Sequence, residues 1–284
     1  MRIIVYVFIS LFLVGGFGLG LSPTYATNTN NEEYPLDFHI EMLHWAVVNE
    51  FLPRYSKFTV IDVETGKSFR VQRRAGRYHA DVQPLTRKDT KIMKEIYNGH
   101  WSWRRRAILI QADNKLIAAS MHGMPHGAGA LDNGFKGHFC IHFKGSVTHR
   151  SERSDLSHQV MINKAGGTID DFVRDLTPNQ LTTTFLVFIK NGDQGLVNKV
   201  AITNKKQVKK ELKKIKNIEA INWKLLSLDE PDPFALEADI PVEVSLLVKN
   251  IGPVKTSIHF HLIRTSPISP WKINMDPLIK LTKK

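Results

Sequence analysis

The first half of the chain carries alternating apolar and polar positions that are typical of β-strands. Runs rich in β-branched and aromatic residues, bounded by turns, occupy residues 58–63, 68–72, 107–112, 116–122 and 139–143. Helical spacing of apolar positions is found at 36–51, 86–98 and 157–165. The pattern therefore predicts a mostly-β domain preceded by a short leading helix.

The pattern changes after Gly166-Gly167, which we interpret as a domain boundary. Helical patterns come first, at 177–192 and 205–216, and strand-like runs follow at 221–228, 242–248, 256–265 and 271–273. This order of helices before a curled antiparallel sheet is similar to that of the NTF2-like cone fold. The resemblance is one of element order and covers about the last hundred residues.

The N-terminus has the pattern of a secretory signal. Arg2 precedes an apolar stretch from Ile3 to Leu21, and the small-residue sequence Thr24-Tyr25-Ala26 closes it. An uncleaved membrane anchor is the alternative, and the glycines of the apolar stretch and the break at Pro23 count against it. We expect residues 1–26 to be removed and the remaining chain to be secreted or associated with the cell wall.

Composition and charge narrow the range of partners. The 284 residues are 42% hydrophobic and 23% charged, which excludes wholesale disorder, a collagen-like repeat and a protein with many membrane spans. The formal net charge is +12 and falls by one, to +11, when Arg2 leaves with the signal. An exported basic chain is expected to meet an anionic envelope, so the predicted partners are peptidoglycan and anionic wall polymers rather than nucleic acid. The sequence specifies no oligomeric state.

The single cysteine, Cys140, lies among most of the histidines. With one cysteine the chain has no internal disulfide, so an exported Cys140 is either a buried apolar side chain or a nucleophile. Eight of the 12 histidines fall between His79 and His158. On an extended strand, Cys140 shares one face with His138 and His142, and the intervening Phe and Ile side chains share the other. We therefore predict an accessible thiol flanked by two imidazoles that lower its pKa or accept its proton.

The residues around Cys140 resemble the motif of the YkuD-type L,D-transpeptidases. That motif is a histidine, a spacer, and then Ser/Thr-His-Gly-Cys followed by an apolar residue and Arg or Asn. Here His122-Gly123 stands 18 residues before Cys140, which is reached through Gly137-His138-Phe139 and followed by Ile141-His142. Gly137 replaces Ser or Thr, Phe139 replaces Gly, and His142 replaces Arg or Asn. The resemblance extends over residues 57–166.

The resemblance implies a covalent mechanism that needs no cofactor. It makes Cys140 the nucleophile, His122 the general base and His138 the third catalytic residue. Backbone N–H groups near the cysteine are expected to stabilise the oxyanion. If the family backbone needs a positive φ at position 139, a Phe there disturbs this oxyanion geometry.

Further residues are expected to support the site. We assign substrate binding to His142, Gly123, Arg104 and Arg105. His79 and Asp81 lie two residues apart, so on an extended segment they share a face and can orient a base or line a metal site with His122 or His142. The chain has no HExxH motif and no paired cysteines, so we assign no metal. We expect His126, His149 and His158 to be surface or loop residues.

The sequence therefore predicts an α+β protein made of four segments: a signal peptide (1–26), a leading helix and linker (27–56), an L,D-transpeptidase-like domain (57–166) and an NTF2-like domain (167–284). The leading hypothesis for its function is a cysteine-dependent L,D-transpeptidase, or a carboxypeptidase if water is the acyl acceptor, acting on peptidoglycan stem peptides. One alternative is a non-catalytic protein that binds peptidoglycan or anionic wall polymer. Another is a metal-dependent peptidase built on the histidines.

Overall fold

The computed structural model describes residues 39–148 and 152–283, which belong to one compact unit. The predicted signal peptide and its cleavage point lie outside these residues. Within the described ranges, no helix combines the length and the apolar character that crossing a membrane requires.

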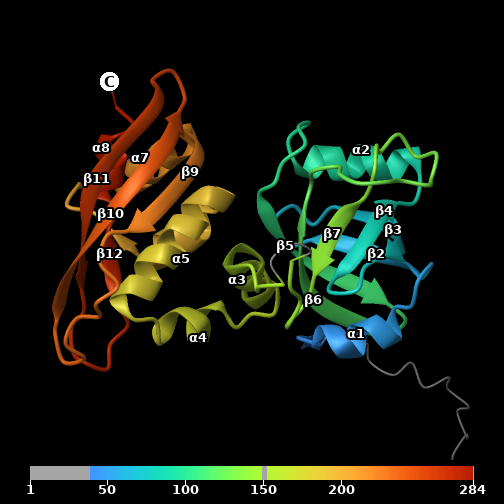
Figure 1. Cartoon of the computed structure of the whole chain (residues 1–284), viewed down its shortest axis with the longest axis horizontal. Helices are drawn as coiled ribbons and strands as arrows, with labels where there is room; N and C mark the ends of the chain where they lie inside the picture. Colours follow the sequence, from blue (N-terminus) through green and yellow to red (C-terminus); the bar gives the residue numbers. More distant parts are fainter. Residues whose placement is uncertain (1–38, 149–151, 284) are drawn as a thin grey trace, which may run out of the picture. The chain divides into compact units, whose positions relative to one another are not determined.

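The first half of the described chain forms a seven-stranded sheet that closes on itself (Figure 1). Its strands are β1 (Ile40–Glu41), β2 (Lys57–Asp62), β3 (Ser68–Ala75), β4 (Ala80–Pro84), β5 (Arg105–Ala112), β6 (Lys115–His122) and β7 (Phe139–His142). They are ordered β1-β6-β5-β2-β3-β4-β7, and an additional pairing of β6 with β7 closes six of them into an antiparallel ring. β1 lies outside the ring and runs parallel to β6.

Local sequence explains most of these strands. In β2, Phe58 and Val60 are buried, as the period of two requires of a strand with one face in the core. Asp62 ends β2 and accepts hydrogen bonds from the backbone N–H and the hydroxyl of Thr65, which fixes the turn into β3. The helix α2 (Arg87–Ile96) lies within the predicted helical pattern at 86–98, and its N-cap Thr86 forms a capping box with Asp89.

The leading helix is shorter than the sequence predicts. α1 covers only Trp45–Phe51, with His44 as its N-cap. Ile40 pairs with Leu116 as part of β1, because this stretch satisfies its backbone by pairing with β6 rather than by continuing the helix. Trp45 and Val48 pack into the core enclosed by the closed sheet.

The second half is also a mixture of helices and strands. The helices α3 (Leu156–Ala165), α4 (Ile169–Arg174), α5 (Pro178–Asn191), α6 (Gln194–Val200), α7 (Val208–Lys214), a 3-10 turn (Ile215–Asn217) and α8 (Asp276–Lys280) accompany the strands β8 (Ala201–Ile202), β9 (Ile218–Leu225), β10 (Glu237–Val248), β11 (Gly252–Ile263) and β12 (Lys272–Asn274). The sheet order is β8-β12-β11-β10-β9, and α5 packs across it (Figure 1). Phe185 of α5 meets Phe260 of β11 edge to face, with ring centroids 5.6 Å apart. The predicted α+β class is confirmed.

Helix α3 packs against elements on both sides of Gly166-Gly167, namely β5 and β6 of the closed sheet and α5. Val160 and Met161 belong to the apolar cluster built around Phe185, and Ala107 and Ala118 of the closed sheet join the same cluster. The domain boundary at residue 166 remains a prediction.

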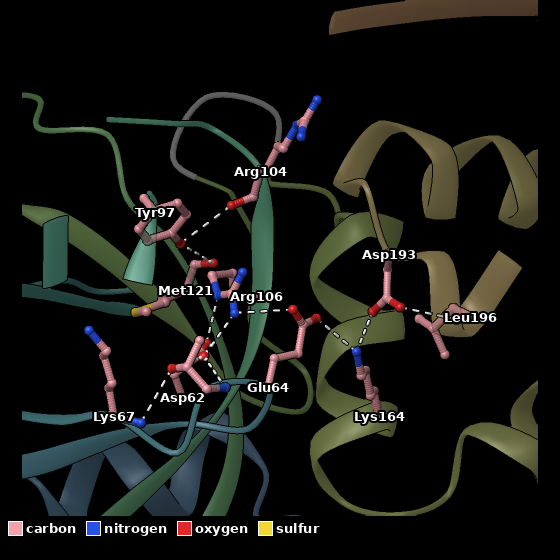
Figure 2. Close-up of polar contacts among 11 residues, drawn as sticks. Asp62, Glu64, Lys67, Tyr97, Arg104, Arg106, Met121, Lys164, Asp193 and Leu196 are labelled. Atoms are coloured by element: carbon pink, nitrogen blue, oxygen red, sulfur yellow. Dashed lines mark hydrogen bonds and ion pairs between the residues drawn. The ribbon is translucent and has the colours of Figure 1, made fainter. Parts of the chain in front are cut away.

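Polar contacts run through the same region (Figure 2). Lys164 of α3 binds both Glu64, at 2.9 Å, and Asp193. Arg106 of β5 also binds Glu64, at 3.1 Å, and holds the buried Asp62 through two nitrogens, at 2.6 and 2.8 Å. α3 is therefore tied by charge to both the turn after β2 and the start of α6.

Candidate functional site

The cysteine lies where two strands of the closed sheet meet. Cys140 of β7 is the direct antiparallel partner of Asp81 in β4. Directly opposed residues project to the same face, so the pairing places the Asp81 carboxylate beside the thiol, with Oδ1 3.7 Å from Sγ. The strand β4 was not predicted, and its register is what brings His79 and Asp81 to the cysteine.

The side chains of β7 alternate as the sequence predicts. Phe139 and Ile141, followed by Phe143, lie in the apolar core of the closed sheet. Cys140 lies on the other face with His138 and His142, where the imidazoles gather. Phe139 sits in a regular strand, and no positive φ occurs there. The backbone at this position therefore does not demand the glycine of the family motif.

The imidazole of His126 faces the thiol. Its Nε2 lies 3.4 Å from Cys140 Sγ. Its Nδ1 lies 3.1 Å from the carbonyl oxygen of Met124. A carbonyl only accepts, so Nδ1 carries the proton and the Nε2 lone pair of the neutral ring faces the sulfur. This is the orientation that a general base for Cys140 needs.

A two-residue backbone bridge places His126. Its N–H donates to the carbonyl of His138 at 3.0 Å, and the N–H of His138 donates back at 2.8 Å. Gly137 makes this approach possible, because its φ is +109° and a Cβ would lie 2.4 Å from the His126 carbonyl oxygen. His126 lies in a loop, as predicted, and this loop folds back onto β7 through the bridge to His138.

Two more imidazoles converge on Asp81. Nε2 of His79 lies 3.3 Å from Asp81 Oδ1, and Nε2 of His138 lies 3.8 Å from the same oxygen. The Nδ1 atoms of these rings face the carbonyl oxygens of Val147, at 2.8 Å, and Ala128, at 3.0 Å. As with His126, the carbonyl fixes the Nδ1 proton, so all three rings direct Nε2 toward Asp81 or Cys140.

The structure moves the pKa of the thiol in the direction opposite to the one predicted. Cys140 is only 3% exposed, and burial raises the pKa of its thiol, with the Asp81 carboxylate adding to the effect. The prediction of an accessible thiol with a lowered pKa is therefore wrong, because the fold buries Cys140 and pairs it with a carboxylate. Burial holds the pKa of His122 and His158 well below the usual range, with nearby cationic groups contributing, so both rings are neutral at pH 7.

The remaining histidines form a stacked row next to the cysteine. His142 lies between His79 and His158, with ring centroids 4.3 and 3.8 Å away. His158 is buried in α3, where its Nδ1 lies 2.9 Å from the hydroxyl of Ser120. Its prediction as a surface residue is therefore wrong, since α3 packs against the sheet. His149 lies outside the described residues.

His122, which the family resemblance makes the general base, is buried and packs against the ring of His126. Its ring centroid lies 5.1 Å from that of His126 and 4.7 Å from that of Trp103. Its Nδ1 accepts a long hydrogen bond, 3.4 Å, from the N–H of Met124. Trp103 is half exposed and also faces His126, at 5.4 Å, so it forms the outer wall over both rings.

The predicted substrate residues other than His142 are engaged in holding the fold. Arg105 pairs with Asp155 at 2.7 Å, and Arg104 donates to the carbonyl of Ile218 at 3.3 Å. Both line a cavity of about 860 Å³ that Cys140 does not reach. At Gly123 a Cβ would lie 2.4 Å from the ring of Tyr97, so this glycine allows close packing. The structure thus gathers His79, Asp81, His122, His138 and His142 around Cys140 and leaves Arg104 outside.

The raised pKa has a measurable consequence for Cys140. At pH 7 we expect native protein to react with iodoacetamide more than about tenfold more slowly than a free thiol, because each unit of pKa elevation removes tenfold of the reactive thiolate. Mass spectrometry of timed aliquots measures the rate, and denatured protein provides the control. Native labelling at the rate of the denatured chain would contradict the burial of the thiol.

The sequence matches no protein-family model and no curated protein.

Proposed function

We propose that this protein is a cysteine-dependent acyltransferase of the L,D-transpeptidase type that acts on peptidoglycan stem peptides. The observation that carries the proposal is the 3.4 Å contact between Cys140 Sγ and His126 Nε2, with Nδ1 held as the donor to Met124. A nucleophile and a base within reach, with the base oriented by a third group, is the arrangement that covalent acyl transfer needs. In this proposal the closed sheet is the transpeptidase-like domain and the second sheet is NTF2-like.

In the proposed reaction the thiol remains protonated until the substrate arrives. Cys140 Sγ then attacks the carbonyl carbon that precedes a terminal D-alanine, and its proton passes to His126 Nε2. Collapse of the tetrahedral intermediate breaks the C–N bond, and His126 returns the proton to the leaving amine. An amine from a second stem peptide, or water, resolves the thioester and releases the thiol.

This assignment gives the base role to His126 and a positioning role to His122. His122 is the histidine that the family spacing selects, but its ring packs against those of His126 and Trp103 and its Nδ1 accepts from the N–H of Met124. Its neutral ring packs against His126 and limits how far that ring can turn. The half-exposed Trp103 offers the substrate an apolar surface next to both histidines.

Release of D-alanine from purified tetrapeptide muropeptides tests the proposal. Parent protein is expected to release D-alanine and to form a thioester adduct visible by mass. Cys140→Ala is expected to do neither while still sedimenting with wall sacculi, because wall binding would rest on the basic surface of the +11 chain. No release and no adduct from parent protein, on substrates of several stem compositions, would end the proposal.

A second candidate function is favoured by the burial of the thiol. A cysteine that is 3% exposed is also what a non-catalytic wall-binding protein would show. That protein would show no turnover, and its binding to sacculi would fall steeply as salt screens the charge. The same muropeptide and sedimentation assays, repeated over a salt series, separate the two functions.

A further inference from the structure

Three potential metal ligands meet at the pair formed by β4 and β7. One ring nitrogen of His79, one carboxylate oxygen of Asp81 and the sulfur of Cys140 all lie within 4.8 Å of one another. Two of the separations are 3.3 Å, from His79 Nε2 to Asp81 Oδ1, and 3.7 Å, from Asp81 Oδ1 to Cys140 Sγ. Metal–nitrogen and metal–oxygen bonds of about 2.0–2.2 Å and metal–sulfur bonds of about 2.3 Å give tetrahedral edges of about this length.

The hydrogen bonding of His79 orients its ring as a metal ligand requires. Its Nδ1 faces the Val147 carbonyl at 2.8 Å, and its Nε2 faces the Asp81 carboxylate at 3.3 Å. The carbonyl only accepts, so Nδ1 carries the proton of the neutral ring and the Nε2 lone pair is directed toward the side of Asp81. A ligating histidine whose other N–H donates to a backbone carbonyl is the usual arrangement in metal sites.

A second group of potential ligands includes the same sulfur, but its histidine tautomers are less suited to binding a metal. It consists of His122, His126 and Cys140, also within 4.8 Å of one another. The Nδ1 of His122 accepts from the N–H of Met124, which leaves the proton of the neutral ring on Nε2. To bind a metal through Nε2, His122 would have to give up this tautomer, whereas His79 already presents its lone pair.

We propose that His79 Nε2, Asp81 Oδ1 and Cys140 Sγ bind one divalent ion of the zinc class. A set of one nitrogen, one oxygen and one sulfur suits Zn²⁺ or Co²⁺ and not Mg²⁺ or Ca²⁺, which require oxygen ligands. The thiol releases its proton to solvent when the sulfur–metal bond forms, and three protein ligands leave a fourth position for water. If the proposed function holds, the bound ion makes the sulfur of Cys140 unavailable as a nucleophile and so reversibly blocks acyl transfer.

Titration of the full chain with Co²⁺ tests the site without reference to activity. We expect one Co²⁺ per chain, with a thiolate-to-cobalt charge-transfer band that Zn²⁺ abolishes by displacement. Cys140→Ser should remove the band, and His79→Gln or Asp81→Asn should weaken Co²⁺ binding by about 100-fold or more, because each removes a direct ligand. His261→Gln changes an exposed histidine near Asp239 of the second sheet and should leave binding unchanged.

His126→Gln separates this proposal from the proposed function. It removes the base but none of the three ligands, so Co²⁺ binding should persist while D-alanine release is lost. Absence of a band in the parent protein would overturn the metal site. So would loss of the band in His126→Gln with retention in His79→Gln, since the second group would then hold the ion.

Two measurements keep the test decisive where a variant folds poorly. Circular dichroism identifies such a variant, and the substitution of another ligand then takes its place: Asp81→Asn is used if His79→Gln does not fold. Elemental analysis of parent protein after gel filtration in Zn²⁺ gives the stoichiometry without any variant. A ratio near one supports the site, and a ratio near zero overturns it.

Discussion

Replacing His126 by Ala is expected to lower the rate of D-alanine release by about 10²–10⁴-fold, the range that a general base contributes. The reason is geometric, because His126 is the imidazole whose Nε2 lone pair faces Cys140 Sγ, 3.4 Å away. His122→Ala should have a smaller effect, because the Nδ1 of His122 already accepts from the N–H of Met124 and its ring packs against that of His126, 5.1 Å away between centroids. Initial rates on one tetrapeptide muropeptide, at matched protein concentration, measure both.

The comparison of His126→Ala with His122→Ala needs two controls, one for the effect of removing any histidine and one for folding. His261→Ala removes an exposed histidine far along the chain and should leave the rate unchanged. Thermal melting of each variant shows whether the site is intact. If His122→Ala lost the activity and His126→Ala retained it, the base would be the residue that the family spacing selects, and the assignment to His126 would be wrong.

The second large effect concerns stability and Asp62. This carboxylate is fully buried and accepts two hydrogen bonds from Arg106, at 2.6 and 2.8 Å, and two from Thr65. Asp62→Ala removes the buried carboxylate that pairs with the Arg106 guanidinium, which is itself largely buried. We therefore expect the free energy of unfolding to fall by about 3–5 kcal/mol. The melting temperature should fall by about 6–20 °C.

A matched control uses the same substitution at a surface pair. Asp132 binds Arg87 at 2.7 Å, but their side chains are 88% and 72% exposed. Because solvent screens such a pair, Asp132→Ala should leave the melting temperature within experimental error of the parent. Equal melting temperatures for Asp62→Ala and Asp132→Ala would mean that the Asp62 network contributes nothing to stability.

The sequence predicted the parts of the site that depend on local periodicity. The alternation along β7 follows from the strand pattern alone, so the shared face of His138, Cys140 and His142 could be inferred. The class of the fold and most strands followed from the same reasoning. The helix of the capping box at Thr86 began where its sequence signal indicated.

The parts that depend on distant pairing could not be predicted in this way. β4 reads Ala-Asp-Val-Gln-Pro, and its polar residues and terminal proline hide a strand whose five residues are all buried. His126 reaches the sulfur because its backbone pairs with that of His138, 12 residues later. The mirrored pairs His126-Gly127 and Gly137-His138 were the available signal, since glycines allow two backbone segments to approach closely.

The dual packing of α3 has a consequence for any attempt to recombine the two sheets in chimeric proteins. One turn of this helix supplies His158 to the imidazole row, and the residues that follow, Val160 and Met161, serve the apolar cluster of Phe185. A junction before α3 would remove one ring of the row from the donor sheet. A junction after Ala165 would keep that ring but leave Val160 and Met161 facing solvent. A chimeric protein that keeps only one of the two sheets therefore needs a new partner whose surface matches α3.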